Sequence, residues 1–194
     1  GTILWGYFAS CMNSVAASLS GNSHMFSKIY FPRLLLPFAL TTSNMGQLLL
    51  NIVIFVGFWG AGLWSGSPIH PTWGLVLVPL LILQCGMVGL GCGLWLSALT
   101  VKYRDLRFAL SFLSQLWMYA TPVIYPLSSI PEQYRLYIQL NPLTPIVESF
   151  RFAFLGAGEL HPLHLLYSLG VMLLALLLGV LLFNRVEQTF MDTV

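Results

Sequence analysis

The chain has 194 residues, of which 57% are hydrophobic and only 7% charged, and its formal net charge is +2. Soluble domains carry about 25% charged residues, so this composition excludes a soluble enzyme, a nucleic-acid-binding protein and a disordered chain. The apolar stretches are continuous and do not alternate with polar residues, which also argues against an outer-membrane β-barrel. We therefore predict an all-α, polytopic helical membrane protein.

Stretches without Asp, Glu, Lys or Arg predict five membrane-spanning helices, because a span needs about 20 apolar residues. The long central stretch must hold two spans, since it is broken by a turn rich in proline and serine. The predicted spans are residues 1–19, two spans within 34–101 on either side of a turn at 64–73, residues 108–125, and residues 163–183.

The distribution of basic residues predicts the orientation of these spans, because Lys and Arg concentrate in cytoplasmic loops. Six of the eight lie in three segments that share one side, namely 21–33, 101–107 and the tail after residue 183. This places the C-terminus in the cytoplasm and Gly1 outside. Gly1 lies in an apolar run without the features of a signal peptide. We therefore expect one membrane domain over residues 1–194 that is truncated at its N-terminus, with six spans in the intact subunit.

The first cytoplasmic loop, residues 21–33, has the sequence GNSHMFSKIYFPR. Asn22 or Ser23 can cap a short helix over Met25–Ile29, which would present an apolar and aromatic surface beside basic side chains. Such a surface is typical of a docking site for a protein partner or of a helix lying on lipid headgroups. The candidate contact residues are Met25, Phe26, Lys28, Ile29, Tyr30, Phe31 and Arg33.

Two patterns in the central spans indicate helix packing. Asn44, Gln47 and Asn51 share one helix face, where they either join helices or line an aqueous path. Gly89 and Gly93 form a GxxxG pair, which favours close approach of a neighbouring helix. The cysteines all lie in apolar stretches, and we expect small packing residues there, with neither a disulfide framework nor a metal site.

The fourth predicted span carries an aromatic face with one amide. Aromatic rings beside a hydrogen-bonding group suit the C–H faces of sugars, although the same spacing also fits an ordinary packed helix face. Three tyrosines beyond this span add hydroxyl-bearing rings. The residues of the face are Phe108, Phe112, Gln115, Tyr119 and Pro122, and the added tyrosines are Tyr125, Tyr134 and Tyr137.

Residues 126–160 predict two short helices, each too short to span a bilayer. Ser129 and Glu132 form a potential capping box for the first, which would run to about Leu140. Thr144 can cap the second, which would end at Gly156. The pair is either a re-entrant hairpin on the outer side, which needs protein or a water-filled cavity around it, or two interfacial helices lying flat.

Glu148 and Arg151 are spaced i, i+3 on the second short helix and can pair with each other. Ionisable side chains at membrane level are often functional, so the pair is either a structural ion pair or a gate contact. The long spans carry no internal carboxylate, which argues against a proton or ion pathway. The sequence offers no catalytic cluster, no Walker A motif and no metal ligand set.

The chain resembles the permease subunits of ABC-2 type polysaccharide exporters, which export O-antigen, capsule and teichoic acid. The resemblance rests on five segments in the same order, namely GNSHMFSKIYFPRLLLP, LWLSALTVKYRDLRF, QLWMYATPVIYPLSSIPE, LNPLTPIVESFRFAFLG and VEQTFMDTV. By this resemblance, we expect an N-terminal amphipathic segment and a further span to precede Gly1 in the intact subunit.

This resemblance implies a homodimeric permease that is not itself an enzyme and has no cofactor of its own. ATP and Mg²⁺ would be bound by two copies of a separate ATPase, which would dock on residues 21–33. The substrate would be a lipid-linked polysaccharide crossing the bacterial inner membrane, and nucleic acid would not be a partner. An ABC-2 drug or lipid efflux permease is the alternative.

The resemblance also gives expected roles to individual residues. The substrate path would include Phe108, Phe112, Gln115, Tyr119 and Tyr125. The outer gate would include Tyr134, Tyr137, Glu148 and Arg151.

Overall fold

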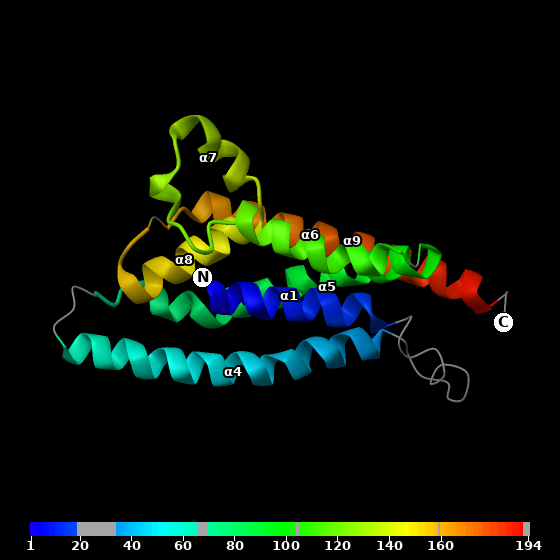
Figure 1. Cartoon of the computed structure of the whole chain (residues 1–194), viewed down its shortest axis with the longest axis horizontal. Coiled ribbons are helices and arrows are strands. Elements are labelled where there is room, and N and C mark those ends of the chain that lie inside the picture. The colour runs from blue at the N-terminus through cyan, green and yellow to red at the C-terminus, as the bar shows by residue number, and fades with distance from the viewer. Residues whose placement is uncertain (19–33, 66–69, 104, 159, 192–194) are drawn as a thin grey trace.

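The computed structural model describes residues 1–18, 34–65, 70–103, 105–158 and 160–191. The described elements are all helical, and the long helices run side by side along the length of the molecule (Figure 1). In chain order they are α1 (Thr2–Ala16), α4 (Leu35–Trp64), the 3-10 turn η1 (Trp73–Leu77), α5 (Val78–Lys102), α6 (Leu106–Ala120), the 3-10 turn η2 (Leu127–Ser129), α7 (Glu132–Gln139), α8 (Leu143–Leu155) and α9 (Pro162–Met191).

Three of the described helices are long and apolar enough to cross a membrane, counting η1 and α5 as one continuous helical segment. They correspond to the second, third and fifth predicted spans. The predicted break between the second and third is confirmed, because α4 ends at Trp64 and helical structure resumes at Trp73. α1 and α6 have 15 residues each, a length of about 22 Å at 1.5 Å per residue.

Several helices begin with a proline in their first turn. Pro37 lies near the start of α4, Pro79 near the start of α5, Pro145 in the first turn of α8, and Pro162 at the first residue of α9. The first backbone N–H groups of a helix have no acceptor within the helix, so a residue without an N–H costs nothing there. These prolines therefore fix where the apolar runs become helical.

α5 lies at the centre of the packed helices, between α1 and α9, and its glycines let both neighbours approach closely. A Cβ added at Gly89 would lie 2.9 Å from Cβ of Cys11, and one added at Gly93 would lie 2.7 Å from Cβ of Val15. On the side that faces α9, a Cβ at Gly91 would lie 2.9 Å from the backbone nitrogen of Leu176. The predicted packing role of Gly89 and Gly93 is confirmed, with α1 as the partner.

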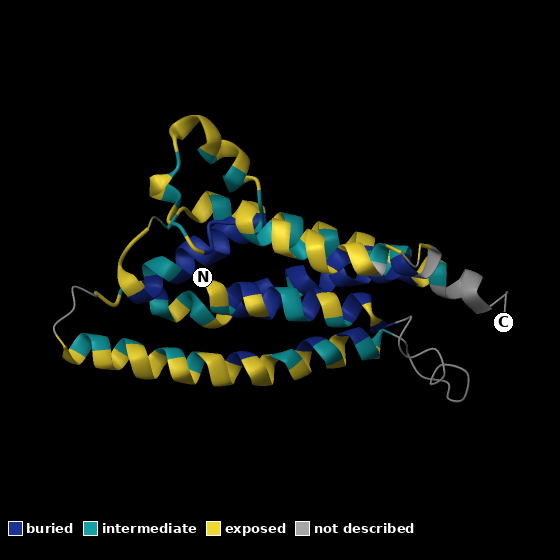
Figure 2. Ribbon diagram, in the orientation of Figure 1, coloured by how far each residue is buried: buried dark blue, intermediate teal, exposed yellow. Residues whose placement is uncertain are grey.

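The burial pattern separates α4 from the central helix α5 (Figure 2). Most of its surface is exposed and apolar, including Leu50, Val53 and Phe58, whereas α5 is half buried along its apolar stretch. Asn44 of the predicted polar stripe donates a hydrogen bond to the hydroxyl of Ser14 in α1, over 2.8 Å, and so joins two helices. The other two residues of the stripe, Gln47 and Asn51, are exposed.

Helix α6 ends earlier than the predicted fourth span. It stops at Ala120, and Thr121 has extended backbone angles because it precedes Pro122, which disfavours the α conformation of the preceding residue. Pro122 is therefore buried beyond the end of the helix and does not share its aromatic face, so that part of the prediction was wrong.

The two predicted helix caps were also wrong. Ser129 cannot cap α7 because Ile130 precedes Pro131 and is extended, so the helix begins at Glu132. The Ser129 hydroxyl instead donates to the carbonyl of Pro126 over 2.7 Å. Thr144 lies inside α8, and its hydroxyl donates to the carbonyl of Ile138.

The side chain of Asn141 makes the hydrogen bond at the start of α8 that we expected from Thr144. Its carbonyl oxygen accepts a hydrogen bond from the backbone N–H of Leu143 over 3.2 Å. The predicted end of α8 at Gly156 is confirmed, since this glycine has the left-handed conformation that commonly ends a helix.

The connections between helices gather at the two ends of the molecule (Figure 1). The end of α1, the start of α4, the α5–α6 connection and the end of α9 lie at one end. The end of α4, the end of α8 and the start of α9 lie toward the other end, where α7 projects from the bundle. The described residues that flank the segments predicted to share the basic side therefore lie at the same end of the molecule.

Candidate functional site

Helix α8 is enclosed by the rest of the molecule, although it is too short to span a membrane. Ten of its 13 residues are buried, and it contacts η1, α5 and α9. Its apolar side chains, such as Ile146 and Phe150, face the helices around it. Any polar group that α8 carries into this position must find a partner within the protein.

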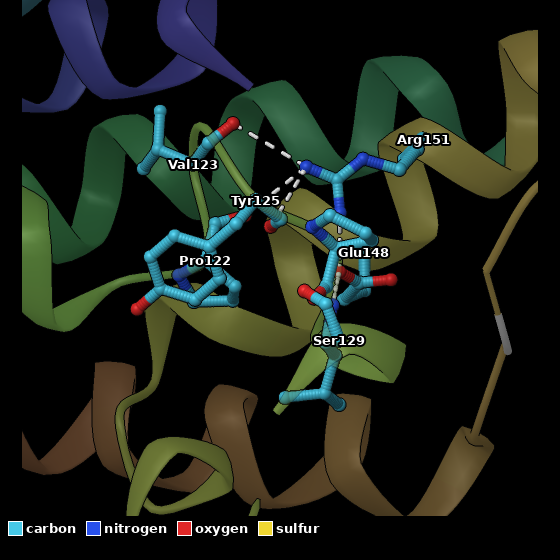
Figure 3. Close-up of polar contacts among 8 residues, drawn as sticks. Pro122, Val123, Tyr125, Ser129, Glu148 and Arg151 are labelled. Carbon is cyan, nitrogen blue, oxygen red and sulfur yellow. Dashed lines mark hydrogen bonds and ion pairs between the residues drawn. The ribbon is translucent and has the colours of Figure 1, made fainter. Parts of the chain in front are cut away.

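The charged residues of α8, Glu148 and Arg151, have such partners within the protein (Figure 3). Arg151 forms an ion pair with Glu148, with 2.5 Å between Nη1 and Oε1, and their side chains are only 13% and 7% exposed. The other terminal nitrogen of Arg151 donates to the backbone carbonyls of Pro122, Val123 and Tyr125, over 3.2, 3.3 and 3.4 Å. The predicted pairing is confirmed, and the pair also holds the segment that follows α6.

Glu148 makes two further close approaches. Its Oε1 accepts a hydrogen bond from the backbone N–H of Leu127 over 3.1 Å. A Cβ added at Gly158 would lie 2.8 Å from its Oε2, and Gly158 also has a φ of +108°, which favours glycine. The ion pair and its hydrogen bonds thus tie α8 to the segment 122–127, with Gly158 beside the carboxylate, and we call Glu148, Arg151 and these contacts the clasp.

The C-terminal carbonyls of α8 are satisfied by the connection between α4 and α5. The indole nitrogen of Trp59 donates to the carbonyl of Phe154 over 2.8 Å. The backbone N–H of Thr72 donates to Ala153 over 3.1 Å, and its hydroxyl donates to Phe152 over 3.0 Å. No local sequence signal indicated that Trp59 or Thr72 would contact the end of α8.

A second buried polar chain lies at the start of α8. The amide nitrogen of Gln84 in α5 donates to the hydroxyl of Ser168 in α9 over 2.9 Å, and that hydroxyl donates to the carbonyl of Pro142 over 2.6 Å. Both side chains are buried. This contact was not predicted, because its only signal in the sequence is an amide within an apolar run.

Helix α7, by contrast, has no buried residue. The predicted gate residues Tyr134 and Tyr137 are both exposed, and neither is among the described hydrogen-bond or ion-pair partners of Glu148 and Arg151. The amide nitrogen of Asn141 donates to the hydroxyl of Thr121 over 2.8 Å and so fixes the α7–α8 turn against the end of α6. The structure therefore does not bring the four predicted gate residues together.

The predicted substrate-path residues on α6 form one exposed surface. Phe108, Phe112, Gln115 and Tyr119 are all exposed. Tyr125 lies beyond the helix, and its hydroxyl donates to the carbonyl of Tyr119 over 2.9 Å. The opposite side of α6 packs against α1, where Trp117 contacts the rings of Trp5 and Phe8.

The predicted docking residues, Met25 to Arg33, lie outside the described residues. The structure therefore adds nothing to the prediction for that segment.

A pocket of about 460 Å³ opens between α7, α8 and the start of α9. It combines polar groups from all three helices and from the loops beside the clasp. Its lining residues are Pro126, Leu127, Ser128, Arg135, Gln139, Thr144, Pro145, Glu148, Ser149, Arg151, Ala157, Gly158, His161 and His164.

Comparison with known proteins identifies the class to which this arrangement belongs. The family model described as ABC-2 type transporter matches residues 1–155, and the chain belongs to this family of multi-pass membrane permeases. Permeases of the family lack an ATPase domain and pair with separate ATPase subunits.

The chain is similar to curated polysaccharide export proteins. It is 30% identical to the O-antigen export system permease protein RfbA of Myxococcus xanthus over 179 residues, covering 90% of this chain and 66% of the relative. An RfbA protein of Klebsiella pneumoniae is 27% identical, over 99% of this chain and 72% of the relative. The polysialic acid transport protein KpsM of Escherichia coli is 28% identical, over 63% of this chain and 44% of the relative.

Proposed function

We propose that this chain is the permease subunit of an ATP-binding-cassette exporter that moves a lipid-linked polysaccharide across the bacterial inner membrane. The observation that carries the proposal is the similarity to the O-antigen permeases, which extends over nearly the whole chain. The exposed aromatic face of α6 supports it, because aromatic rings beside an amide suit sugar surfaces.

The membrane placement that we propose has five spans in this chain. They are α1, α4, η1 with α5, α6 with the segment that follows it, and α9. The end of the molecule that adjoins the basic segments faces the cytoplasm, as the positive-inside rule predicts. α8 then enters from the outer side as a re-entrant helix, and its burial by protein makes that depth tolerable.

Cysteine labelling tests this orientation. With a membrane-impermeant maleimide on intact cells, Ser65→Cys is labelled, whereas Asn184→Cys is labelled only after permeabilisation. Both positions are exposed in the protein, so accessibility from the bulk solution differs only by membrane side. The reverse pattern would invert the topology.

The clasp is the element that we propose holds the outer gate in position. Opening toward the outer side moves the segment 121–127, which carries the carbonyls that Arg151 binds. A second copy of the permease completes the path, with the α6 surfaces of the two copies facing the polysaccharide.

Two copies of a separate ATPase supply the energy and bind ATP and Mg²⁺. We propose that they dock on residues 21–33. Phe26→Asp then removes the ATPase from the purified complex. Normal co-purification and export in that variant would exclude this docking site.

The proposed substrate is tested by deleting the gene in the source bacterium. Loss of this permease removes surface polysaccharide and leaves its lipid-linked form inside the cell, and the wild-type gene restores export. Unchanged surface polysaccharide with increased sensitivity to a toxic compound would favour the drug-efflux alternative.

The same strain tests the aromatic path. Tyr119→Ala lowers the amount of surface polysaccharide without loss of the protein from the membrane. Phe58→Ala, which removes an exposed ring from α4, is the matched control and leaves export unchanged. Equal export in the two variants would contradict a role for Tyr119.

A further inference from the structure

The pocket between α7, α8 and the start of α9 is lined by basic groups from three parts of the chain. Arg135 comes from α7, Arg151 from α8, and His161 and His164 from the start of α9. Glu148 is the one carboxylate among the described lining residues. A pocket with this lining attracts an anion if its positive charge exceeds what Glu148 neutralises.

Within the pocket lining, the positive charge of Arg135 is not neutralised by Glu148, which pairs with Arg151. Glu148 and Arg151 form an ion pair, so together they contribute no net charge. Arg135 instead donates from Nε to the carbonyl of Ile130 over 3.1 Å and from Nη2 to that of Ser128 over 3.2 Å. These acceptors carry no formal charge, but they fix the guanidinium at the pocket wall.

The two histidines add hydrogen-bonding groups from the start of α9. Their ring centroids lie 5.2 Å apart in an edge-on arrangement, and the backbone N–H of His164 donates to the carbonyl of His161 over 3.1 Å. A neutral imidazole can donate one hydrogen bond and a protonated one donates two. The pocket thus offers donors from several directions around a fixed positive charge.

The helix above the pocket has the composition of a membrane interface. Tyr134, Leu136 and Tyr137 are exposed on α7, as is Leu140 directly after it, and tyrosines concentrate where headgroups meet the hydrocarbon. With the outer placement of α7 and α8, the pocket lies at headgroup level. This step rests on the proposed membrane orientation.

We propose that this pocket binds a phosphate group, supplied by the headgroup of an anionic phospholipid. A planar guanidinium matches the geometry of phosphate oxygens, and Arg135 is already held in place for that contact. The volume of about 460 Å³ is within the usual range of small-ligand pockets. Bound phosphate joins α7 to the clasp and so stabilises the hairpin.

Thermal unfolding and native mass spectrometry of the purified permease in detergent test the proposal. Phosphatidylglycerol is expected to remain bound and to raise the unfolding temperature, whereas phosphatidylcholine has a smaller effect. Inorganic phosphate added alone distinguishes a lipid headgroup from a free phosphate anion as the ligand. Protection by inorganic phosphate but not by phosphatidylglycerol would assign the pocket to a free anion. The measurement needs no export activity, so its outcome is separate from that of the proposed transport function.

Variants locate the binding in the pocket. Arg135→Gln is expected to weaken phosphatidylglycerol binding about tenfold, because a hydrogen bond to a charged group has been lost. Arg135→Lys keeps the charge and retains part of the binding. Arg185→Gln removes the same charge at the opposite end of the molecule and leaves binding unchanged. Equal phosphatidylglycerol binding by wild type and Arg135→Gln, or an equal loss in Arg185→Gln, would overturn the proposal.

Discussion

The two short helices α7 and α8 are neighbours in sequence, yet they differ in how the protein holds them. α8 is buried over ten of its 13 residues, and its charges and terminal carbonyls have partners on other elements. α7 has no buried residue and projects from the bundle (Figure 2). A hairpin of two short helices can therefore contain one helix that is buried in the protein and one that is exposed.

The composition of the two helices explains the difference. α8 carries large apolar residues along one face, such as Ile146, Phe150 and Phe154, and burying this face stabilises the fold. α7 carries charged and polar residues as well as tyrosines, which suit a surface with one polar and one apolar side. Mutations that remove contacts of α8 should therefore cost stability, whereas matched changes outside those contacts should not.

Removing the carboxylate of the clasp should have the largest effect. Glu148→Ala leaves Arg151 buried without its charge partner and is expected to destabilise the protein by about 3 kcal/mol. Reversible unfolding in detergent measures this cost. Glu132→Ala removes an exposed carboxylate from α7 and should change stability by less than about 0.5 kcal/mol. Similar losses of stability in the two variants would show that α8 does not depend on its charged pair more than α7 depends on an exposed carboxylate.

Adding a methyl group beside the clasp should have the next largest effect. Gly158→Ala forces a residue with a Cβ into a φ of +108° and places that Cβ 2.8 Å from Oε2 of Glu148. We expect a cost of about 2 kcal/mol, measured by the same unfolding experiment. Gly170→Ala is the control, because a Cβ there meets nothing within 4 Å and alanine favours the helix. A neutral Gly158→Ala variant would show that the loop moves freely relative to α8.

Loss of a single cap at the end of α8 should have the smallest effect. Trp59→Phe keeps an aromatic ring against Phe154 but removes the hydrogen bond to its carbonyl, so the expected cost is about 1 kcal/mol. Trp64→Phe changes an indole that is 94% exposed and should leave unfolding unchanged. An equal loss of stability in both variants would indicate that Trp59 acts as an anchor at the membrane interface and not as a cap of α8.

Features encoded by continuous or local patterns were predictable from the sequence. Apolar runs gave α4, α5 and α9 and the break after Trp64, because length and hydropathy alone determine such helices. The spacing of Gly89 and Gly93 gave a close helix contact, and the i, i+3 spacing of Glu148 and Arg151 gave their ion pair.

Features that depend on tertiary contacts or on proline geometry were not predicted correctly. The contact of Trp59 with Phe154 joins residues far apart in the chain, and so does that of Gln84 with Ser168; no local periodicity records either pair. The end of α6 and the start of α7 were misplaced because residues before Pro122 and Pro131 cannot easily be helical.

The glycines of α5 also have a mechanical consequence. Because α1 and α9 approach its backbone directly at these glycines, no long side chain separates the helices at those points and could re-pack during a small displacement. α1, α5 and α9 therefore behave as one stiff frame. α6 touches that frame through few contacts, among them the rings around Trp117, and α4 presents most of its surface outward. Of the described helices that pack against this frame, α6 is the least restrained by it, and the clasp holds the segment that follows this helix.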